Sequence, residues 1–360
     1  MADSHWTACN RLFLSANSAN MAGPNRRSLL QLLGLGASYG LLLIILLVLT
    51  LWAAGALYFT FPFTKVRGLS AAIYVIAVAG VLVAIRPLWK GAIAGVGLFL
   101  LVFAWTPTIR PSNDGPWEPD VAQTAWAEID GDKVTIHNFR NFDYRTATDP
   151  IPNWETRTVD LTTLQGIDLF VNYWGVEWMA HPIVSFQFGD ADHVAFSIEL
   201  RRRVGQPSST LAGLYKTYGL IYLVGDERDL VRVRTNYRKE DVYLYRTAVK
   251  PARARAIFLD YLRSLNALHE HPEFYNELTS NCTTNVRVHT AATAIGKPPP
   301  WDWRMLINGY ADEMLYERGD LLGQLAFADL KRQALINEKA KAADHDLDFS
   351  RRIRDGAAGF

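Results

Sequence analysis

The chain has 360 residues, which at roughly 100–200 residues per domain allows more than one folded unit. Its 37 basic and 36 acidic residues nearly balance, so the overall charge gives no support for a nucleic-acid partner. Apolar residues are concentrated in the first third, which indicates a membrane-embedded part.

Three apolar segments in that first third predict three transmembrane helices, within a membrane region over 29–109. The first, residues 29–61, has no charged residue and exceeds the roughly 20 residues that cross a bilayer. Segments 69–85 and 91–109 are shorter and together predict a helical hairpin. A cleaved signal peptide is the alternative for the first segment, since small residues at 52–56 follow its apolar core.

The residues before the first apolar segment predict a cytoplasmic, disordered N-terminus over 1–28. Met21 offers an alternative start that would leave out Cys9. Basic residues near the helix ends favour this orientation, five on the cytoplasmic side against three on the other. They are Arg11, Arg26, Arg27, Arg86 and Lys90, against Lys65, Arg67 and Arg110. With three crossings, the chain from about residue 110 onward is exoplasmic.

A linker rich in Pro, Ser, Asn, Asp and Gly over 110–120 leads into a domain predicted to span 121–330. Its first half predicts strands and its second half amphipathic helices, an α+β arrangement in which an antiparallel sheet packs on helices. The strands are expected at 133–137, 157–161, 166–174, 181–188, 193–201, 218–224 and 230–234, and at Tyr243 and Tyr245. The helices are expected at 251–268, 282–294 and 308–322, and the charged 331–360 predicts a surface helix fraying into a tail.

The best predicted hairpin joins 181–188 to 193–201, and its register places a histidine opposite a glutamate. Val184, Phe186 and Phe188 form one apolar face of the first strand, and every second residue from Val194 onward forms the apolar face of the second strand. Both faces are buried on the same side of the hairpin only if even-numbered residues of one strand pair with even-numbered residues of the other. With 188–192 as the loop, His181 then lies across from Glu199, as a base and its orienting carboxylate should. Solvent-facing polar residues on an amphipathic hairpin are the alternative interpretation.

Cys282 is the other chemically informative residue, because it is the only cysteine after residue 9. A single cysteine in an exported domain cannot form an internal disulfide. Asn281 is a good N-cap residue, so Cys282 is predicted in the first turn of a helix. There the helix dipole and free N–H groups favour the thiolate and can hold an oxyanion. A buried structural cysteine is the alternative.

A thiol nucleophile needs a base, usually histidine, and the remaining histidines offer no obvious partner. His137, His269, His271, His289 and His345 are expected in loops or on solvated helix faces. The pair at 269 and 271 could ligate a metal, but no third ligand is indicated. We expect no metal and no cofactor.

The stretch from Trp126 to about Gly323 contains a series of ordered motifs. They are Ala180-His181, Val184-Ser185-Phe186, Ser197-x-Glu199-x-Arg201, Ile221-Tyr222-x-Val224-Gly225-Asp226-Glu227-Arg228-Asp229, Arg234-Thr235-Asn236-Tyr237-Arg238, Asp241-Val242-Tyr243-Leu244-Tyr245 and Asn281-Cys282-Thr283-Thr284-Asn285. With these motifs in this order, the stretch resembles the Lnb N-terminal periplasmic domain family. The family is similar to circularly permuted papain-like thiol enzymes, which include NlpC-type amidases and lecithin:retinol acyltransferase-like proteins. In those enzymes a strand-borne histidine precedes a helix-borne cysteine, which is the order His181 then Cys282 here.

The resemblance implies a permuted papain-like domain at the bacterial inner membrane, with Cys282 as nucleophile and His181 as general base. Glu199 is implied as the orienting group, with His193 as its rival. Further orienting or substrate contacts are implied at Arg201, Asn236, Tyr237 and Asn281, although a salt bridge from Arg201 to Glu199 or Asp192 is an alternative. Because Lnb proteins are implicated in lipoprotein N-acylation, membrane phospholipid and a lipoprotein acceptor are the implied partners. This chain lacks the long C-terminal membrane region of full Lnb proteins.

Three hypotheses follow. The first is a membrane-anchored acyltransferase or acyl hydrolase that forms a thioester on Cys282. The second is a cysteine amidase or peptidase acting on cell-wall peptide, and the third is a tethered binding domain without catalysis. For the first, Trp174, Trp178, Trp301 and Trp303 could form an aromatic surface at the bilayer interface.

Overall fold

The computed structural model describes residues 26–189, 192–294, 296–297 and 300–360. Within it the chain divides into two compact units, Met1–Thr108 and Ile109–Phe360. The predicted disordered N-terminus up to residue 25, with Cys9 and Met21, lies outside the described residues.

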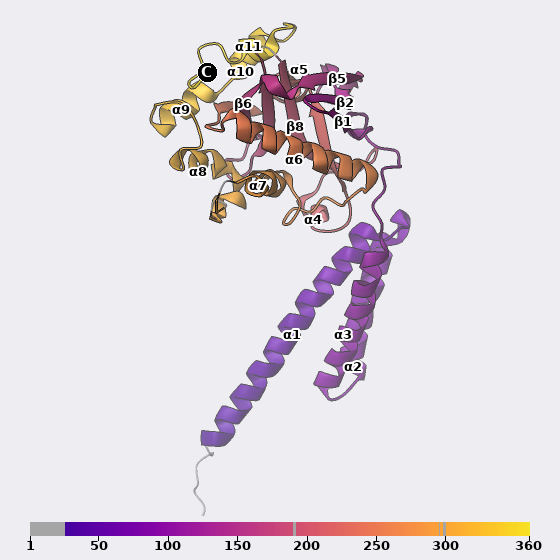
Figure 1. The fold of residues 1–360 in the computed structure, drawn as a ribbon. Coiled ribbons are helices and arrows are strands. Elements are labelled where there is room, and N and C mark those ends of the chain that lie inside the picture. The colour runs from indigo at the N-terminus through magenta and orange to yellow at the C-terminus, as the bar shows by residue number, and fades with distance from the viewer. Residues whose placement is uncertain (1–25, 190–191, 295, 298–299) are drawn as a thin grey trace, which may run out of the picture. The chain divides into compact units, whose positions relative to one another are not determined.

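The first unit consists of three long helices, α1 (Arg26–Thr60), α2 (Arg67–Ala84) and α3 (Leu88–Trp105) (Figure 1). All three are long and apolar enough to cross a membrane, as the sequence predicted. A short 3-10 turn, Thr64–Val66, precedes α2. Gly91 lets α3 approach α2 closely, because a Cβ there would lie 2.9 Å from the Val81 carbonyl oxygen.

The second unit is built on one large sheet, with strand order β1-β2-β9-β8-β7-β6-β10 and β5 also paired with β2. The strands are β1 (Trp126–Asp130), β2 (Lys133–Arg140), β5 (Trp154–Asp160), β6 (Leu164–Tyr173), β7 (His181–Phe188), β8 (Asp192–Arg201), β9 (Gly219–Gly225) and β10 (Asp241–Arg246). A separate hairpin joins β3 (Asp143–Thr146) to β4 (Asp149–Ile151). The α+β prediction is confirmed, but the sheet is mixed rather than wholly antiparallel, because β2 and β9 pair in parallel.

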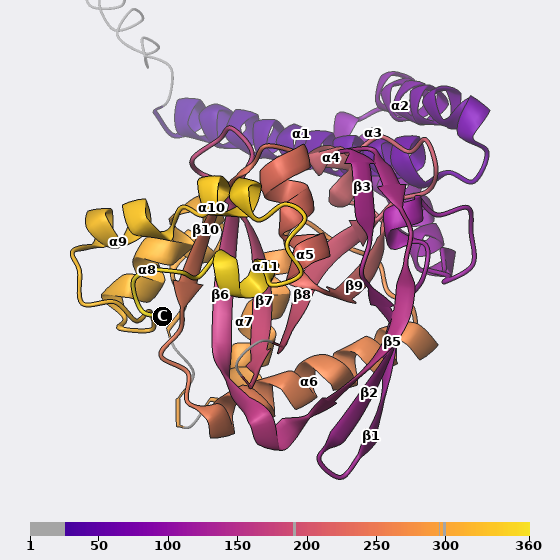
Figure 2. The same cartoon turned by 90° about the horizontal axis from the view of Figure 1, so that it is seen from above.

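One face of the sheet is covered by α6 (Pro251–Glu270), followed in the chain by α7 (Cys282–Ala292) and α8 (Ala311–Glu317) (Figure 2). Phe186 and Phe196 point to this face and meet Phe258 and Tyr261 of α6 edge to face, with ring centroids 4.9–5.9 Å apart. These contacts bury the aromatic side that the alternation in β7 and β8 predicted.

The opposite face is covered by α5 (Glu227–Leu230), α10 (Asn337–Ala342) and α11 (Phe349–Arg352) (Figure 2). Ile183 and Ala195 of the sheet pack in one core with Ala340, Phe349 and Ile353. The helix α9 (Phe327–Ala334) leads into this layer, and a short α4 (Thr210–Gly213) precedes β9. The prediction of a fraying tail after residue 331 is therefore wrong, because Ile336, Ala340, Phe349 and Ile353 of this segment are buried and close the core.

A buried ion cluster fixes the same C-terminal layer to the sheet. Arg354 Nη2 donates to Asp168 Oδ2 and to Glu227 Oε1, each at 2.7 Å, and both carboxylates are fully buried. Ser185 Oγ also donates to Glu227 Oε1. Removing Arg354 would leave the buried Glu227 carboxylate without its arginine, whereas Asp168 would keep its contact with Arg246 Nε at 2.6 Å.

The segment 230–234, predicted as a strand, is helical. Asp226 caps α5 by accepting a hydrogen bond from Arg228 N at 2.9 Å, and a π-helical turn, Val233–Tyr237, follows. The segment 226–229 between the two predicted strands is thus a helix start, where Asp is a favoured cap residue and further acidic side chains suit the helix dipole. Residues 230–234 are rich in the branched apolar residues that are common in strands. Here Leu230 and Val233 are buried in the core, but the segment does not pair in the sheet.

Candidate active site

The predicted hairpin register is confirmed, and it brings His181 and Glu199 together. Ile183 pairs with Ser197 and Phe188 with Asp192, which sets positions 181 and 199 opposite each other. His181 Nε2 lies 3.2 Å from Glu199 Oε1. The two groups form an ion pair whenever the imidazole is protonated.

A serine and an arginine complete the surroundings of that pair. His181 Nε2 lies 2.7 Å from Ser197 Oγ, which in turn donates to Glu199 Oε1 at 2.6 Å. Arg234 Nη2 donates to the same carboxylate oxygen at 2.6 Å, and its Nη1 donates to Glu240 Oε2 at 2.9 Å. The carboxylate of Glu199 is thus fixed from three directions, and the imidazole is oriented through Nε2.

Electrostatics favour a charged imidazole here. Burial alone would lower the pKa of His181, and so would Arg234, but the Glu199 carboxylate and the Cys282 thiol outweigh both and raise this pKa to about 9. Burial would raise the pKa of Glu199, but His181 and Arg234 hold that pKa well below its ordinary value. At neutral pH the site therefore contains an imidazolium facing a carboxylate.

Cys282 is the first residue of α7, as the sequence predicted. Asn281 is the N-cap, its side-chain oxygen accepting from Thr284 N at 2.8 Å while Thr284 Oγ1 accepts from Asn281 N at 2.9 Å. This reciprocal capping box fixes the start of the helix. The amides of Cys282 and Thr283 precede the first intrahelical hydrogen bond, so helix geometry leaves them available to an acceptor outside the helix.

The thiol and the imidazole lie in the same site. The Cys282 side chain is close enough to His181 to be one cause of the raised histidine pKa, after the Glu199 carboxylate. Cys282 is partly accessible and carries no disulfide. Burial raises the pKa of Tyr275, and the nearby Cys282 and Glu199 side chains raise it further. A chain of polar groups therefore runs from the thiol through the imidazole to Ser197 and the carboxylate.

Asn308 holds together the two segments that carry the pair. Its Oδ1 accepts from the backbone N–H of Ala180, directly before His181, at 2.8 Å. Its Nδ2 donates to Thr283 Oγ1, directly after Cys282, at 2.6 Å. The distance between thiol and imidazole is thus controlled by one amide side chain that belongs to neither segment.

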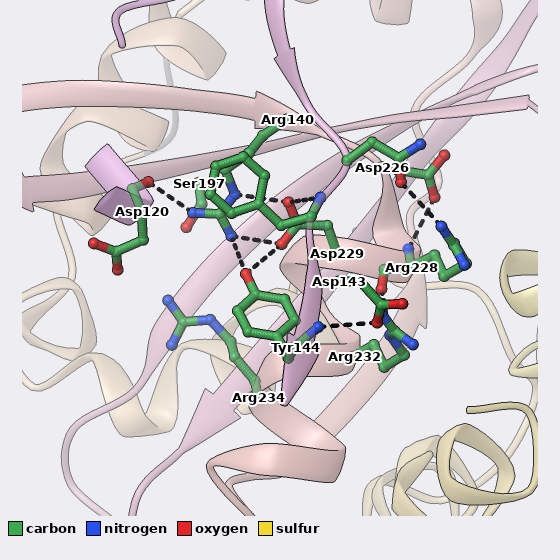
Figure 3. Close-up of polar contacts among 12 residues, drawn as sticks. Asp120, Arg140, Asp143, Tyr144, Ser197, Asp226, Arg228, Asp229, Arg232 and Arg234 are labelled. Atoms are coloured by element: carbon green, nitrogen blue, oxygen red, sulfur yellow. Dashed lines mark hydrogen bonds and ion pairs between the residues drawn. The ribbon is translucent and has the colours of Figure 1, made fainter. Parts of the chain in front are cut away.

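A polar cavity of about 590 Å³ lies on the carboxylate side of this arrangement, with Ser197, Glu199 and Arg234 in its wall. Beside them, Asp229 accepts from Arg140 Nη2 at 2.7 Å and from the Tyr144 hydroxyl at 2.6 Å (Figure 3). Asp229 also accepts from Phe142 N at 2.8 Å, so this buried carboxylate is fully satisfied. The Arg140 cluster is therefore a structural wall of the cavity.

Two other residues proposed from sequence lie away from the pair. His193 pairs with Gln187 across the hairpin, six positions along β7 from His181 and roughly 20 Å away at about 3.3 Å per residue. Its charge acts on Glu227 instead. Arg201 donates to the carbonyls of Val121 and Ala122 at 2.9 and 2.7 Å, so it anchors the incoming linker and forms neither predicted salt bridge.

Asn236 and Tyr237 also face a different part of the domain. Asn236 Nδ2 donates to Asp344 Oδ1 at 2.6 Å and to Ala340 O at 3.1 Å, which ties α10 to the π-helical turn. Tyr237 packs on Tyr144 with ring centroids 5.5 Å apart. Their motif lies next to Arg234 in the sequence, but the turn directs them away from it.

Sequence reasoning assigned no role to Ser197, Arg234, Tyr275 or Asn308. Ser197 shares the strand face of His181 and Glu199, so the register could have identified it. Arg234 and Asn308 lie 35 and 109 positions beyond Glu199, and no local pattern connects them to it.

His289 was expected on a solvated helix face but is buried. Its Nδ1 lies 2.8 Å from Asp260 Oδ2, and its Nε2 lies 2.9 Å from the Tyr222 hydroxyl. It joins α7 to α6 and to β9. Over the described ranges, no group of three or more His, Cys, Asp or Glu side chains could hold a metal ion.

The fold and site define an α+β domain with a cysteine–histidine pair, in a chain that also has three apolar N-terminal helices. Residues 151–309 match the family model described as the Lnb N-terminal periplasmic domain, and this part of the chain belongs to that family. Comparisons with curated proteins and with solved structures found no match. The chain is thus a membrane-associated Lnb-like protein with a periplasmic domain.

Proposed function

We propose that this protein is a membrane-anchored periplasmic acyltransferase or acyl hydrolase that takes an acyl chain from phospholipid through a thioester on Cys282. The observation that carries the proposal is the position of His181, which lies close to the Cys282 thiol and has its Nε2 held by Ser197 and Glu199. A nucleophile, a base and an orienting group in this order are what thiol catalysis needs.

In the first half-reaction, the imidazolium of His181 stabilises the Cys282 thiolate, which attacks the ester carbonyl. A carbon–sulfur bond forms as the carbonyl π electrons move to oxygen, and the free amides of Cys282 and Thr283 hold that oxyanion. When the carbon–oxygen bond breaks, the imidazolium gives its proton to the departing glycerol oxygen. The products are an acyl-thioester and a lysophospholipid.

In the second half-reaction, an amine such as a lipoprotein N-terminus, or water, attacks the thioester. The neutral imidazole of His181 takes the proton of the attacking group, the carbon–sulfur bond breaks, and the thiolate returns to its pair with the imidazolium. Since Nε2 faces Ser197 and Glu199, Nδ1 is the nitrogen that exchanges protons at the thiol. Glu199 stays ionised throughout and holds the ring orientation.

We also propose the permuted papain-like arrangement for the domain. A histidine at the start of β7 and a cysteine at the first position of α7, in that chain order, support it. The family match and the three apolar helices support an inner-membrane location with the domain in the periplasm. A tethered enzyme meets membrane lipid at a high effective concentration.

Four tryptophans support contact with a lipid surface. Trp174, Trp178, Trp301 and Trp303 are all exposed, which a role in the core would not allow. Gly309 N donates to the Trp178 carbonyl at 3.2 Å, so the loops that carry these residues touch each other next to Asn308. Tryptophan at an apolar–polar boundary is typical of membrane interfaces.

The deciding experiment is the intact mass of the full-length protein after incubation with phospholipid vesicles. We expect a fatty-acyl adduct in the wild type and in Cys9→Ser, which removes the only other cysteine. The adduct should be absent in Cys282→Ala and in His181→Ala, and present in His137→Ala as the histidine control. An adduct that persists in Cys282→Ala would refute the thioester mechanism.

Reaction with a cell-wall peptide in place of lipid would instead identify an amidase with the same pair. A Cys282→Ala protein that retains full biological function would identify a binding domain without catalysis.

A further inference from the structure

A second, apolar cavity lies on the α6 face of the sheet. It encloses about 200 Å³ between β6, β7 and the helices α6, α7 and α8. Most of its wall is aliphatic, including Leu169, Val171, Val184, Ile257, Val286 and Met314. For comparison, an apolar cavity of roughly 150 Å³ can hold a benzene ring.

This cavity begins at the proposed reaction centre. Ala180, Thr283 and Asn308 all line it. Ala180 directly precedes His181, Thr283 directly follows Cys282, and Asn308 hydrogen-bonds to both segments. One end of the cavity is therefore one residue away from each member of the pair.

The cavity then follows one stripe of α7. Thr283, Val286, Arg287, Thr290 and Ala291 line it, at the i, i+3, i+4, i+7 and i+8 spacing of a single helix face. From the first to the last of these positions the helix rises about 12 Å. The cavity wall thus extends along α7, away from the helix start that carries the thiol.

Polar side chains stand where the stripe ends. Arg253 and Asp320 line the cavity there, and Arg253 Nη2 donates to Thr290 O at 3.3 Å, in the last turn of α7. Arg318 also lines the cavity. Burial raises the pKa of the Asp320 carboxyl, and the nearby charges of Arg318 and Arg253 oppose that rise. An apolar occupant would stop against this end, because burying hydrocarbon against a charged group costs solvation of that group.

We propose that this cavity binds the acyl chain of the lipid donor, with the ester carbonyl at Cys282 and the methyl end toward Arg253. The inference rests on the acyl-transfer function proposed above and adds the chain site and its length limit. An extended hydrocarbon advances roughly 1.3 Å per carbon for a bond of about 1.52 Å, so about nine carbons fit along the stripe. Each methylene within that length should favour binding by roughly fourfold.

The test measures kcat/KM of the full-length Cys9→Ser protein for p-nitrophenyl esters with acyl chains of 2 to 16 carbons. We expect a steep rise up to about nine carbons, then a plateau, because carbons beyond that length find no further apolar wall. Val286→Phe and Ala311→Phe fill the cavity from two different helices. Both should lose at least tenfold toward the 8-carbon ester and keep the wild-type rate toward the 2-carbon ester.

Val288→Phe is the matched control, since Val288 lies on the same helix but is 59% exposed and outside the cavity wall. It should match the wild type at every chain length. Equal rates in the cavity-filling variants and the wild type at 8 carbons would overturn the chain site. Having two such variants keeps the test valid if one of them fails to fold.

If the proposed acyl-transfer function is wrong, the result differs from the one that would overturn the chain site, because none of the esters acylates the wild-type protein. The cavity is then tested by binding of a fluorescent 10-carbon fatty acid to Cys282→Ala protein. Adding Val286→Phe to that background should weaken binding at least tenfold, whereas adding Val288→Phe should not. Unchanged binding in both would refute the proposal independently of catalysis.

Discussion

The charge state of His181 depends on one carboxylate, and Glu199→Gln removes that charge with little change of shape. In the wild type the pKa of His181 is about 9, compared with an ordinary value of 6.5. Burial and Arg234 both lower this pKa, so without the Glu199 charge we expect it to fall below 6.5. A difference of 2.5 pKa units corresponds to about 3 kcal/mol, or a roughly 300-fold change in the ratio of charged to neutral imidazole.

The consequence should appear in the reactivity of the thiol. With a neutral imidazole at pH 7, the Cys282 thiolate loses its counter-charge and alkylation by iodoacetamide should slow. We expect the alkylation rate to fall at least tenfold. The decrease should be smaller than the roughly 300-fold change in the ratio of charged to neutral imidazole, because the amide oxygen that replaces the carboxylate still accepts hydrogen bonds from Ser197 and Arg234. The rate is measured by intact mass in a Cys9→Ser background, and ¹³C-histidine NMR follows the titration of the ring directly.

Glu240→Gln is the matched control for this experiment. Glu240 contacts the same arginine through its other terminal nitrogen, Nη1, which donates to Glu240 Oε2 at 2.9 Å, whereas Nη2 donates to Glu199. It should alkylate at the wild-type rate. Our reasoning would be refuted if Glu199→Gln also reacted at the wild-type rate, or if both variants slowed equally.

Further predictions concern pH, the position of the pair and the two walls of the domain. Because the pKa of His181 is raised, its protonated ring stabilises the fold fully below about pH 6.5, and this stabilisation is lost as the pH rises through about 9. The midpoint temperature of unfolding should therefore fall over that range, and Glu199→Gln should show a flatter profile. Asn308→Ala removes the link between the segments that carry His181 and Cys282 and should cost about 1–3 kcal/mol in denaturant unfolding. It should also lower kcat more than it raises KM, and an unchanged kcat would exclude the positioning role. Phe349→Ala should cost about 3–5 kcal/mol of unfolding free energy, because this ring is fully buried in the core under α11. A negligible effect would show that the C-terminal layer is not part of the folded domain. Asp229→Asn removes the charge that pairs with buried Arg140 and should cost about 3–5 kcal/mol while leaving the iodoacetamide rate at Cys282 unchanged. A slowed rate would mean that the Arg140 cluster belongs to the reaction centre.

Much of the site could be predicted from the sequence, because its main signals are local. The alternation of β7 and β8 and the loop between them define a register, and that register places His181 opposite Glu199. The cap residue Asn281 defines the start of α7 and hence the position of Cys282. Each inference needed only residues within about twenty positions of one another.

Predictions based on amino-acid composition were wrong for the C-terminal segment and for His289, because burial against distant parts of the chain determines the structure at both places. The last thirty residues are charged and alanine-rich, which is typical of a tail, yet Phe349 and Ile353 are enough to complete the core over the sheet. His289 looks like a surface residue of an amphipathic helix until α6 supplies Asp260 and β9 supplies Tyr222. In both places the partner comes from a distant part of the chain.

The sequence by itself determined which residues could react, since a lone helix-start cysteine and a strand-borne histidine are visible in local patterns. Only the tertiary structure decided how they are held, through Arg234 on the carboxylate, Asn308 between the two segments and the apolar cavity along α7. These contacts join positions up to 128 residues apart in the chain. Hydrogen bonds and packing between residues so far apart in the chain depend on how the helices and strands dock. Docking of this kind leaves no periodic pattern in the sequence.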